Sequence, residues 1–299
     1  MKKISLFFGL ALSLVGCQNG EADYDASGVF EATEVIVSAK GTGELVAFNL
    51  QEGQELSLGQ VVGCIDTTQL ALKRQQLLAT ISATESRRLN VSRQLASLRQ
   101  QQENLKAERQ RFAQLVSEHA ANQKQVDDID HQLRVVREQI AATSEQIGSN
   151  NQSITGQAGS IAAQIAQIDD QIGNCIVRSP LQGTVLTQYM QQGEFAAPGK
   201  PLFKVADIKH LRLRAYITAD QLTGLKLGQR VKVYADQGKT DRKEYPGTVT
   251  WISDKAEFTP KTIQTRDERA NLVYAIKVDV LNDGLIKRGM YGDVRLSDD

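Results

Sequence analysis

Apolar side chains recur every seven residues along the middle of the chain, in two long series. The first comprises Leu70, Leu77, Thr84, Val91, Leu98, Leu105 and Phe112, and the second Val126, Leu133, Ile140, Ile147, Ile154, Ile161 and Ile168. A strict seven-residue repeat favours a left-handed coiled coil. The break around 120–125 is short enough to make the two helices antiparallel neighbours. The pattern therefore predicts a hairpin over 67–174 whose two continuous helices, of roughly 50 residues each, are about 75 Å long.

One stretch of the second series, 148–159, is rich in glycine, serine and asparagine. Helix propensity alone favours a loop there, because each glycine costs about 1 kcal/mol relative to alanine. Ile147 and Ile154 nevertheless keep the seven-residue phase, which an ordinary loop would reset. The pattern predicts a continuous but locally weak helix.

Glycines on the two sides of this hairpin repeat with unchanged spacing. Gly43, Gly53 and Gly59 return as Gly183, Gly193 and Gly199, and the apolar Leu45 and Val62 return as Val185 and Leu202. Glycines at equal spacing indicate equal turns, and the short apolar runs between them read as strands. Neither copy, 28–66 or 175–206, has enough apolar residues for a core of its own. The repeat predicts one small β-sandwich, split by the hairpin.

Beyond residue 206 apolar and polar side chains alternate, as in Leu211, Leu213, Ala215 and Ile217, which is typical of half-buried strands. Further strands are expected at 228–234, 247–252, 272–280 and 292–296, with a helical turn at 220–225 and a polar loop at 254–271. Such a set predicts a compact β-barrel or sandwich. One more strand, at 29–37, is expected to join either β unit.

The N-terminus has the features of an export signal. Lys2 and Lys3 precede an apolar run, 4–15, that is too short to span a bilayer. The run ends in Leu-Val-Gly-Cys at Cys17, which resembles the lipobox of bacterial lipoproteins and implies lipidation of that cysteine. The polar stretch 18–27 is expected to be a flexible tether. Alternatively, the segment is an ordinary signal peptide that contains a cysteine.

Composition excludes several functions. Lys and Arg number 35, as do Asp and Glu, so the net charge is zero and a nucleic-acid partner is not expected. His119, His131 and His210 form no familiar metal-ligand spacing with the cysteines, and no phosphate-binding glycine loop opens a helix. We therefore expect no cofactor, no metal and no catalytic site.

Two further cysteines, Cys64 and Cys175, lie at the two ends of the predicted hairpin. An exported chain can form disulfides, and the ends of an antiparallel hairpin are neighbours. A disulfide between them is one interpretation. The other is two small buried apolar side chains, the commoner role of sparse cysteines.

The order of these elements resembles the HlyD-type periplasmic adaptors, or membrane fusion proteins. The resemblance is carried by lipoyl-like halves at 39–45 and 176–185, the latter reading Ile-Val-Arg-Ser-Pro-Leu-Gln-Gly-Thr-Val, and by Lys-Arg-Gly-Met at 287–290, with Arg288 where the family has proline. The stretch 257–269 resembles the subgroup linked to ABC-type exporters. In true lipoyl carriers a lysine is modified at the junction of the halves; here Asp66 is followed by Thr67 and the hairpin, so a carrier enzyme is not expected.

In this family the hairpin tip docks on an outer-membrane duct of the TolC type. The docking residues follow a pattern in which three residues separate an arginine from a leucine and six residues separate that leucine from a serine. Arg111 and Leu115 match, and Asn122 stands in place of serine. Asparagine is also small and can donate and accept hydrogen bonds. The alternative for Arg111 is a solvated side chain on the flank of a helix.

The resemblance implies a mixed β and α fold in six parts: signal peptide 1–17, tether 18–27, first lipoyl-like half 28–66, coiled-coil hairpin 67–174, second lipoyl-like half 175–206 and β-barrel 207–299. It implies a non-enzymatic adaptor in efflux or secretion. Such an adaptor sits in the periplasm as a ring of copies, lipid-anchored to the inner membrane, and joins an inner-membrane transporter to the duct. A structural coiled-coil envelope lipoprotein without a transport role is the alternative.

Overall fold

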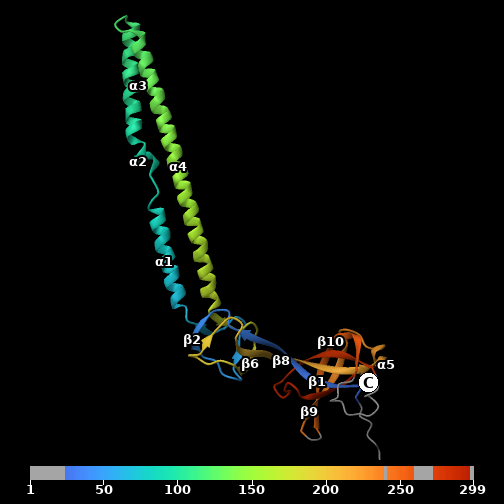
Figure 1. Cartoon of the computed structure of the whole chain (residues 1–299). Helices are drawn as coiled ribbons and strands as arrows, with labels where there is room; N and C mark the ends of the chain where they lie inside the picture. The colour runs from blue at the N-terminus through green and yellow to red at the C-terminus, as the bar shows by residue number, and fades with distance from the viewer. Residues whose placement is uncertain (1–23, 239–240, 259–271, 297–299) are drawn as a thin grey trace, which may run out of the picture.

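The computed structural model describes residues 24–238, 241–258 and 272–296. A long two-helix arm projects from an elongated base made of strands (Figure 1). The combination of antiparallel sheets and a long helix that the sequence predicts is confirmed. Cys17 with its signal segment, most of the predicted tether and residues 259–271 lie outside the described residues.

The base next to the arm is built from both glycine-marked repeats. The first repeat supplies β2 (Gly43–Phe48), β3 (Glu55–Leu56) and β4 (Val61–Ile65), and the second supplies β5 (Ile176–Arg178), β6 (Gly183–Gln188) and β7 (Phe195–Ala196). One sheet has the order β5-β4-β2-β7, and β3 pairs with β6 in the other. The two repeats bury a common cluster, here called the split core, that includes Leu45, Ile65, Val185 and Val205.

The repeats fold together by exchanging equivalent hydrogen bonds. The backbone N–H of Gly53 donates to the carbonyl of Val185 over 2.9 Å. Its counterpart Gly193 donates to Leu45 over 2.9 Å. Leu45 and Val185 are themselves equivalent positions, so each half completes the other as the sequence repeat predicts.

Two long strands, β1 (Ala26–Ser38) and β8 (Pro201–Thr218), continue from the split core into the C-terminal part. The sequence left open which β unit the first strand joins, and it joins both. Its start at Ala26 also places the last two residues of the predicted tether in a strand. The boundary expected at 206/207 falls inside β8, so the two β units share a strand pair.

Six strands of the C-terminal part close a ring of neighbours in the order β1-β12-β9-β10-β11-β8 and back to β1. The ring adds β9 (Arg230–Gln237), β10 (Asp241–Phe258), β11 (Leu272–Leu281) and β12 (Tyr291–Arg295), and α5 (Ala219–Leu222) follows β8. Alternate β8 residues from Leu211 to Ile217 are buried inside it. Residues 254–258 of the predicted loop belong instead to β10, where Phe258 pairs with Leu272.

The arm consists of α1 (Thr68–Glu85), α2 (Val91–Gln94) and α3 (Ala96–Ser117) on one side and α4 (Gln123–Asn174) on the other. Both α1 and α3 contact α4. The 52 residues of α4 run without interruption through 148–159, so the predicted continuous helix is confirmed there. Ile147, Ile154 and Ala158 are buried along this stretch.

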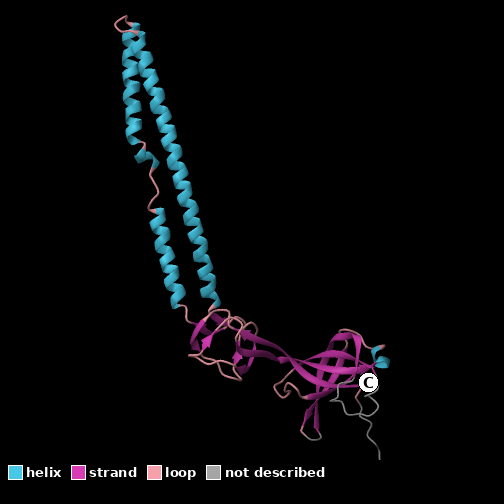
Figure 2. Ribbon diagram, in the orientation of Figure 1, coloured by secondary structure: helices cyan, strands magenta, loops and turns pink. Residues whose placement is uncertain are grey.

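The first side of the arm differs from its prediction. We expected one continuous helix from residue 68 to about 120, but the helix is interrupted at 86–90 (Figure 2). The seven-residue phase is the same before and after the gap, so the hydrophobic periodicity does not predict the interruption. The contacts that hold the interrupted stretch come from α4 and are described below.

Candidate functional site

The tip of the arm is a tight helix-to-helix turn at 118–122. His119 has a φ of 61°, the left-handed conformation that usually falls to glycine. Its N–H donates to the carbonyl of Val116 over 3.0 Å, and Ala120 donates to Leu115 over 2.8 Å. These two bonds are the Schellman pattern, which satisfies the last carbonyls of α3. With no glycine to mark it, sequence reasoning missed this role of His119.

Asn122 has a structural role at the same turn. It is the N-cap of α4, and its side-chain oxygen accepts a hydrogen bond from the backbone N–H of Lys124 at 3.0 Å. Asparagine is among the best N-cap residues, and replacing such a residue by alanine typically costs about 1 kcal/mol. The residue stays exposed beside the tip.

Arg111 and Leu115 lie one turn apart on α3, on the same face of the helix. The Arg111 side chain is 67% exposed, 3.7 Å from Glu108, and its guanidinium lies 5.5 Å from the ring centre of Phe112. Leu115 is half-buried. The structure thus brings two of the three predicted docking residues together and places the third just past the turn.

An ion pair between the helices fixes this end of the arm. Arg109 Nε on α3 lies 2.5 Å from Asp130 Oδ1 on α4. The hydrogen bond from Arg109 lowers the pKa of Asp130, and the reciprocal bond raises the pKa of Arg109. Both side chains are partly exposed, so the contribution to stability is modest. Because the partners come from different helices, their pairing was not apparent in the sequence.

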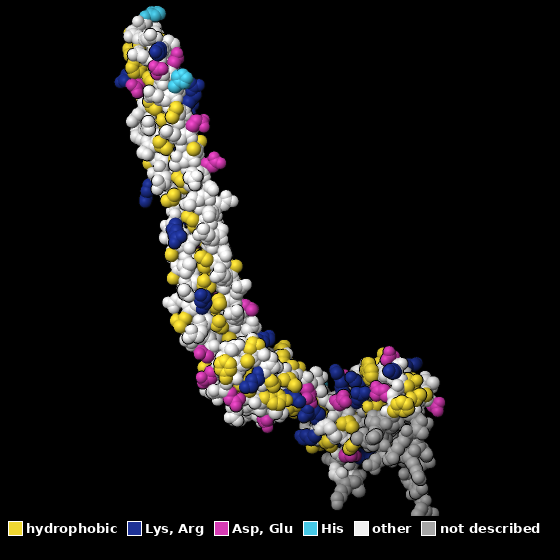
Figure 3. Space-filling view, in the orientation of Figure 1, with side chains coloured by type: hydrophobic (Ala, Val, Ile, Leu, Met, Phe, Trp, Pro, Cys, Tyr) yellow, Lys and Arg dark blue, Asp and Glu magenta, His cyan; other side chains and the backbone are white. Residues whose placement is uncertain are grey.

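Charge is concentrated toward the tip. Charged and histidine side chains gather near the end of the arm, whereas its middle is mostly uncharged (Figure 3). A hollow of about 360 Å³ on α4 is lined by Asp127, Asp130, His131, Leu133, Arg134 and Arg137. Such a mixed-charge surface favours a partner surface of complementary charge over a small apolar ligand.

The junction of the arm with the split core is pinned by Asp66. Its carboxylate accepts hydrogen bonds from the backbone N–H and the hydroxyl of Thr68, at 2.8 and 2.6 Å. These bonds lower the pKa of Asp66 and hold the first turn of α1, where a negative charge is favourable. Thr67, which follows Asp66 where a lipoyl carrier has its lysine, is the N-cap of α1.

The two cysteines are free thiols in the structure. Cys175 is buried in the split core, and burial raises the pKa of its thiol. Cys64 is half-exposed and donates to the carbonyl of Ile65 at 3.3 Å. Cys64 pairs with Ile176 across β4 and β5, so the ends of the arm are adjacent. The disulfide stays a prediction.

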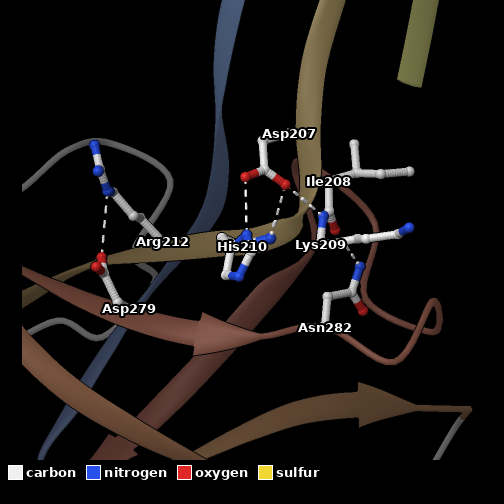
Figure 4. Close-up of polar contacts among 7 residues, drawn as sticks. All are labelled: Asp207, Ile208, Lys209, His210, Arg212, Asp279 and Asn282. Atoms are coloured by element: carbon white, nitrogen blue, oxygen red, sulfur yellow. Dashed lines mark hydrogen bonds and ion pairs between the residues drawn. The ribbon is translucent and has the colours of Figure 1, made fainter. Parts of the chain in front are cut away.

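Below the split core, β8 makes a bulge at 208–210 where β1 has no matching residues. Asp207 holds this bulge (Figure 4): its carboxylate accepts from the backbone N–H groups of Lys209 and His210 at 3.0 and 3.1 Å, and from the His210 ring at 2.9 Å. Burial disfavours the charged carboxylate, but these bonds outweigh it and lower the pKa of Asp207. Asn282 closes the other side by donating to the Ile208 carbonyl at 2.9 Å.

Ion pairs connect the two β units on either side of this bulge. Lys209 lies 3.1 Å from Glu55 of the first repeat. Glu34 on β1 contacts both Arg288, from the C-terminal part, and Lys204 on β8, the latter at 3.2 Å. Arg288 is the position where the resembled family has proline. Its charge gives this chain a contact between the units that proline could not make.

Within 24–238, 241–258 and 272–296, no group of three or more metal-ligating side chains occurs. Among those same residues, no helix has the length and apolarity needed to cross a bilayer.

Comparison with solved structures finds the same arrangement of elements elsewhere. MacA from Actinobacillus actinomycetemcomitans is 18% identical, with a TM-score of 0.53 over 90% of this chain and 76% of MacA. A MacA-MexA chimera that contains the Pseudomonas aeruginosa MexA α-hairpin domain is 18% identical, with a TM-score of 0.51 over 91% of this chain and 81% of the chimera.

The membrane fusion protein Spr0693 from Streptococcus pneumoniae R6 also matches, at 19% identity and a TM-score of 0.49, over 91% of this chain and 98% of Spr0693. No protein-family model matches the chain. At these identities the likeness concerns the fold. The chain has the fold of the HlyD-type membrane fusion proteins that its sequence resembles.

Proposed function

We propose that the chain is the periplasmic adaptor subunit of a multicomponent efflux or secretion system. The observation that carries the proposal is the architecture: a 52-residue helix and its broken partner project from a core that two sequence repeats complete jointly. The fold shared with MacA supports it. A protein of this shape contacts one partner at the tip of its arm and another at its base.

In this proposal the arm, 67–174, is a coiled-coil hairpin that reaches toward an outer-membrane duct of the TolC type. The split core, with 28–66 and 175–206, is the lipoyl-like domain. The strand ring, which 207–299 forms together with β1, is the β-barrel domain next to an inner-membrane transporter of the ABC type. Several copies form a ring, because one tip offers little contact area and binding through many tips is stronger by multivalency.

Docking is assigned to Arg111, Leu115 and Asn122 at the tip. Arg111 and Asn122 are exposed, and Leu115 is a half-buried apolar residue one turn away from Arg111. The Asn122 oxygen already accepts one hydrogen bond as a cap, which holds the side chain in place beside the tip. We therefore assign most of the recognition to Arg111 and a positioning role to Asn122.

The experiment is crosslinking of the full-length protein in the cell envelope, followed by purification in detergent. An adaptor is expected to carry with it a transporter and an outer-membrane duct. The charge reversal Arg111→Asp should abolish crosslinking to the duct and export, while leaving crosslinking to the transporter intact. Arg99→Asp is the matched control, since Arg99 is exposed on the same helix but about 18 Å lower along the arm.

Recovery of the wild-type protein with neither component would contradict the proposal. It would favour the alternative, a structural coiled-coil lipoprotein of the envelope. Full export by Arg111→Asp would instead leave the adaptor role intact and assign Arg111 to the solvated surface.

Membrane attachment through a lipid on Cys17, in the inner membrane, belongs to the same proposal. Each buried methylene of a lipid chain contributes about 0.8 kcal/mol. Cys17→Ser should release the protein into the soluble periplasmic fraction or block its processing. Unchanged membrane fractionation together with an unmodified Cys17 in mass spectrometry would contradict the anchor.

The disulfide between Cys64 and Cys175 remains a separate proposal. Closing a loop of about 110 residues would stabilise the fold by on the order of 4–5 kcal/mol in the chain-entropy model. Thiol labelling of the exported protein, denatured without reductant, distinguishes the cases. Two labelled thiols besides Cys17 would exclude the bond.

A further inference from the structure

The interruption of the arm at 86–90 lies on one side only. α1 ends at Glu85, α2 begins at Val91, and α4 passes the gap without a break (Figure 2). The gap contains neither proline nor glycine, the two residues that usually break helices. Thr84 and Val91 on its two sides keep the seven-residue spacing. Local sequence therefore does not explain the gap, and its cause lies in the contacts with α4.

Asn151 of α4 binds the backbone of the interrupted stretch. Its side-chain oxygen accepts from the N–H of Leu89 at 3.0 Å, and its side-chain nitrogen donates to the carbonyl of Leu89 at 2.9 Å. One amide thus satisfies both backbone groups of a residue that has no helical partners. Asn90 then caps the helix that follows by accepting from Arg93 at 3.1 Å.

Arg88 provides the second contact with α4. It occupies a seam position four residues after Thr84, as Arg74 and Arg109 do after Leu70 and Leu105. Where the helices are continuous, these arginines face carboxylates: Arg74 lies 2.6 Å from Asp169, and Arg109 lies 2.5 Å from Asp130.

Arg88 faces no carboxylate on α4. Its guanidinium donates instead to the hydroxyl of Thr155 at 2.6 Å. A continuous helix would place this charge at the seam opposite Asn151 and Thr155, with no counter-charge. With 86–90 unwound, Arg88 reaches the Thr155 hydroxyl while Asn151 binds the freed backbone.

The second helix is weak at the same height. The glycine-rich stretch 148–159 contains Asn151 and Thr155 and so lies beside the gap. A Cβ added at Gly148, Gly156 or Gly159 would meet no atom within 4 Å, so packing does not require glycine there. Each glycine lowers helix stability by about 1 kcal/mol relative to alanine. The two sides of the arm are therefore both weak at the same position along its length.

We propose that residues 86–90 and 148–159 form a joint at which the arm bends, with Asn151 and Arg88 as its positioning residues. Below the joint α1 packs against α4, and above it α3 packs against α4. α4 acts as the continuous spine, and the Asn151 amide holds the unwound chain against it. The joint follows from these contacts and does not depend on the proposed function.

Hydrogen exchange on the full-length protein tests the contacts. Amides of 86–90 and 148–159 are expected to exchange faster than those of α3 and of α4 toward the tip. Asn151→Ala should speed exchange at Leu89 on the order of tenfold, since it removes both hydrogen bonds to that residue. Asn150→Ala is the matched control, because Asn150 is an exposed neighbour on the same helix.

Bending is tested by spin labels introduced as noncanonical amino acids at the exposed positions Glu138 and Gln164 on α4, about 39 Å apart along a straight helix. The double variant Arg88→Leu/Asn151→Leu makes the seam apolar and should restore a continuous first helix. It is expected to narrow the label distance distribution and raise the helical signal in circular dichroism.

Two results would overturn the joint. One is an Asn151→Ala variant whose exchange matches that of Asn150→Ala. The other is a distance distribution that is already as narrow in the wild-type protein as in the double variant. Amides of the split core serve as an internal reference in both experiments, so a variant that misfolds globally is recognised.

Discussion

Glycines of the repeat are required for two different reasons. Gly53, Gly59, Gly193 and Gly199 have φ between 76° and 90°, the left-handed region, and a Cβ at any of them would meet no atom within 4 Å. Gly183 is different. A Cβ there would lie 2.4 Å from the carbonyl oxygen of Ala206, because β6 and β8 approach each other closely.

We therefore expect the cost of alanine to depend on position. Gly199→Ala should destabilise by about 1–2 kcal/mol, the strain of a side chain in the left-handed region. Gly183→Ala should cost about 3 kcal/mol or more, since backbone must move away from backbone. Urea unfolding followed by β-sheet circular dichroism measures both. Equal losses would contradict the close approach at Gly183.

A polar cluster in the C-terminal part centres on Asp283. Its carboxylate accepts from Lys243 at 2.5 Å and from the hydroxyl of Tyr245 at 3.0 Å. The hydrogen bond from Lys243 is the main cause that lowers the pKa of Asp283 to about 2. Burial and the bond to Asp283 raise the pKa of Tyr245.

This cluster gives a pH-dependent contribution to stability. The pKa of Asp283 is lower in the fold than the value of about 3.9 in an unfolded chain. Its contribution is therefore complete above roughly pH 5 and is lost as pH falls from about 4 through about 2. Asp283→Asn should be less stable than the wild-type protein at neutral pH, and the difference should shrink in that window. Urea unfolding across the pH series measures it.

Lys243→Met is the control for this prediction, because it removes the main cause of the shift while leaving the carboxylate in place. It should weaken the pH dependence in the same window. A wild-type stability advantage that stays constant down to pH 2 would contradict the role given to Asp283.

At the scale of elements, α4 shows how burial outweighs propensity. Its stretch 148–159 stays helical because Ile147, Ile154 and Ala158 are 5–6% exposed against the first side of the arm. Burying such a side chain contributes roughly 1.5–3 kcal/mol for isoleucine, which offsets the cost of the nearby glycines. The helix is continuous, but its local stability is low.

Gly156→Ala should accordingly stabilise the arm by about 1 kcal/mol, since the added Cβ meets nothing within 4 Å. Ile154→Asp should destabilise it by several kcal/mol, because it buries an unpaired charge. Thermal unfolding followed by the helical signal measures both. A destabilising Gly156→Ala together with a silent Ile154→Asp would show that the stretch is not helical.

At the scale of the whole molecule, the arm is an insertion into a core that does not need it. The two halves of the split core bond to each other through equivalent positions, and Cys64 pairs with Ile176 where the arm leaves and returns. The ends of the insertion are therefore adjacent. The base has its own buried clusters at the two ends of the shared strands β1 and β8.

Replacing 67–174 by a short Gly-Ser linker should leave a folded β protein that unfolds cooperatively. Circular dichroism and thermal unfolding measure this. A matched deletion of 39–66 removes one half of the split core and should abolish folding of the other half. Aggregation of the arm-deleted protein would show that the arm is needed for the base to fold.

The sequence by itself determined the parts of this protein whose signal is periodic or repeated. Seven-residue spacing is enough to identify the seam of the arm, because burial along a helix pair follows that period. Equal glycine spacing is enough to identify the two halves as copies of one unit, because turns at equal spacing separate strands of equal length. Arg111 and Leu115 were found as a motif, and one turn of helix places them together.

Only the tertiary structure decided what depends on contacts between distant residues. At the gap, 86–90, Asn151 of α4 forms hydrogen bonds with the backbone of Leu89, and α4 has no carboxylate opposite Arg88. These contacts involve both sides of the arm, so the sequence of either helix alone does not predict the gap. The left-handed His119 and the capping role of Asn122 depend on how α3 and α4 meet at the tip. The sharing of β1 and β8 by both β units follows from strand pairing between distant parts of the chain. Alternation of apolar and polar residues predicts which face of a strand is buried, but it does not predict which strand is the pairing partner.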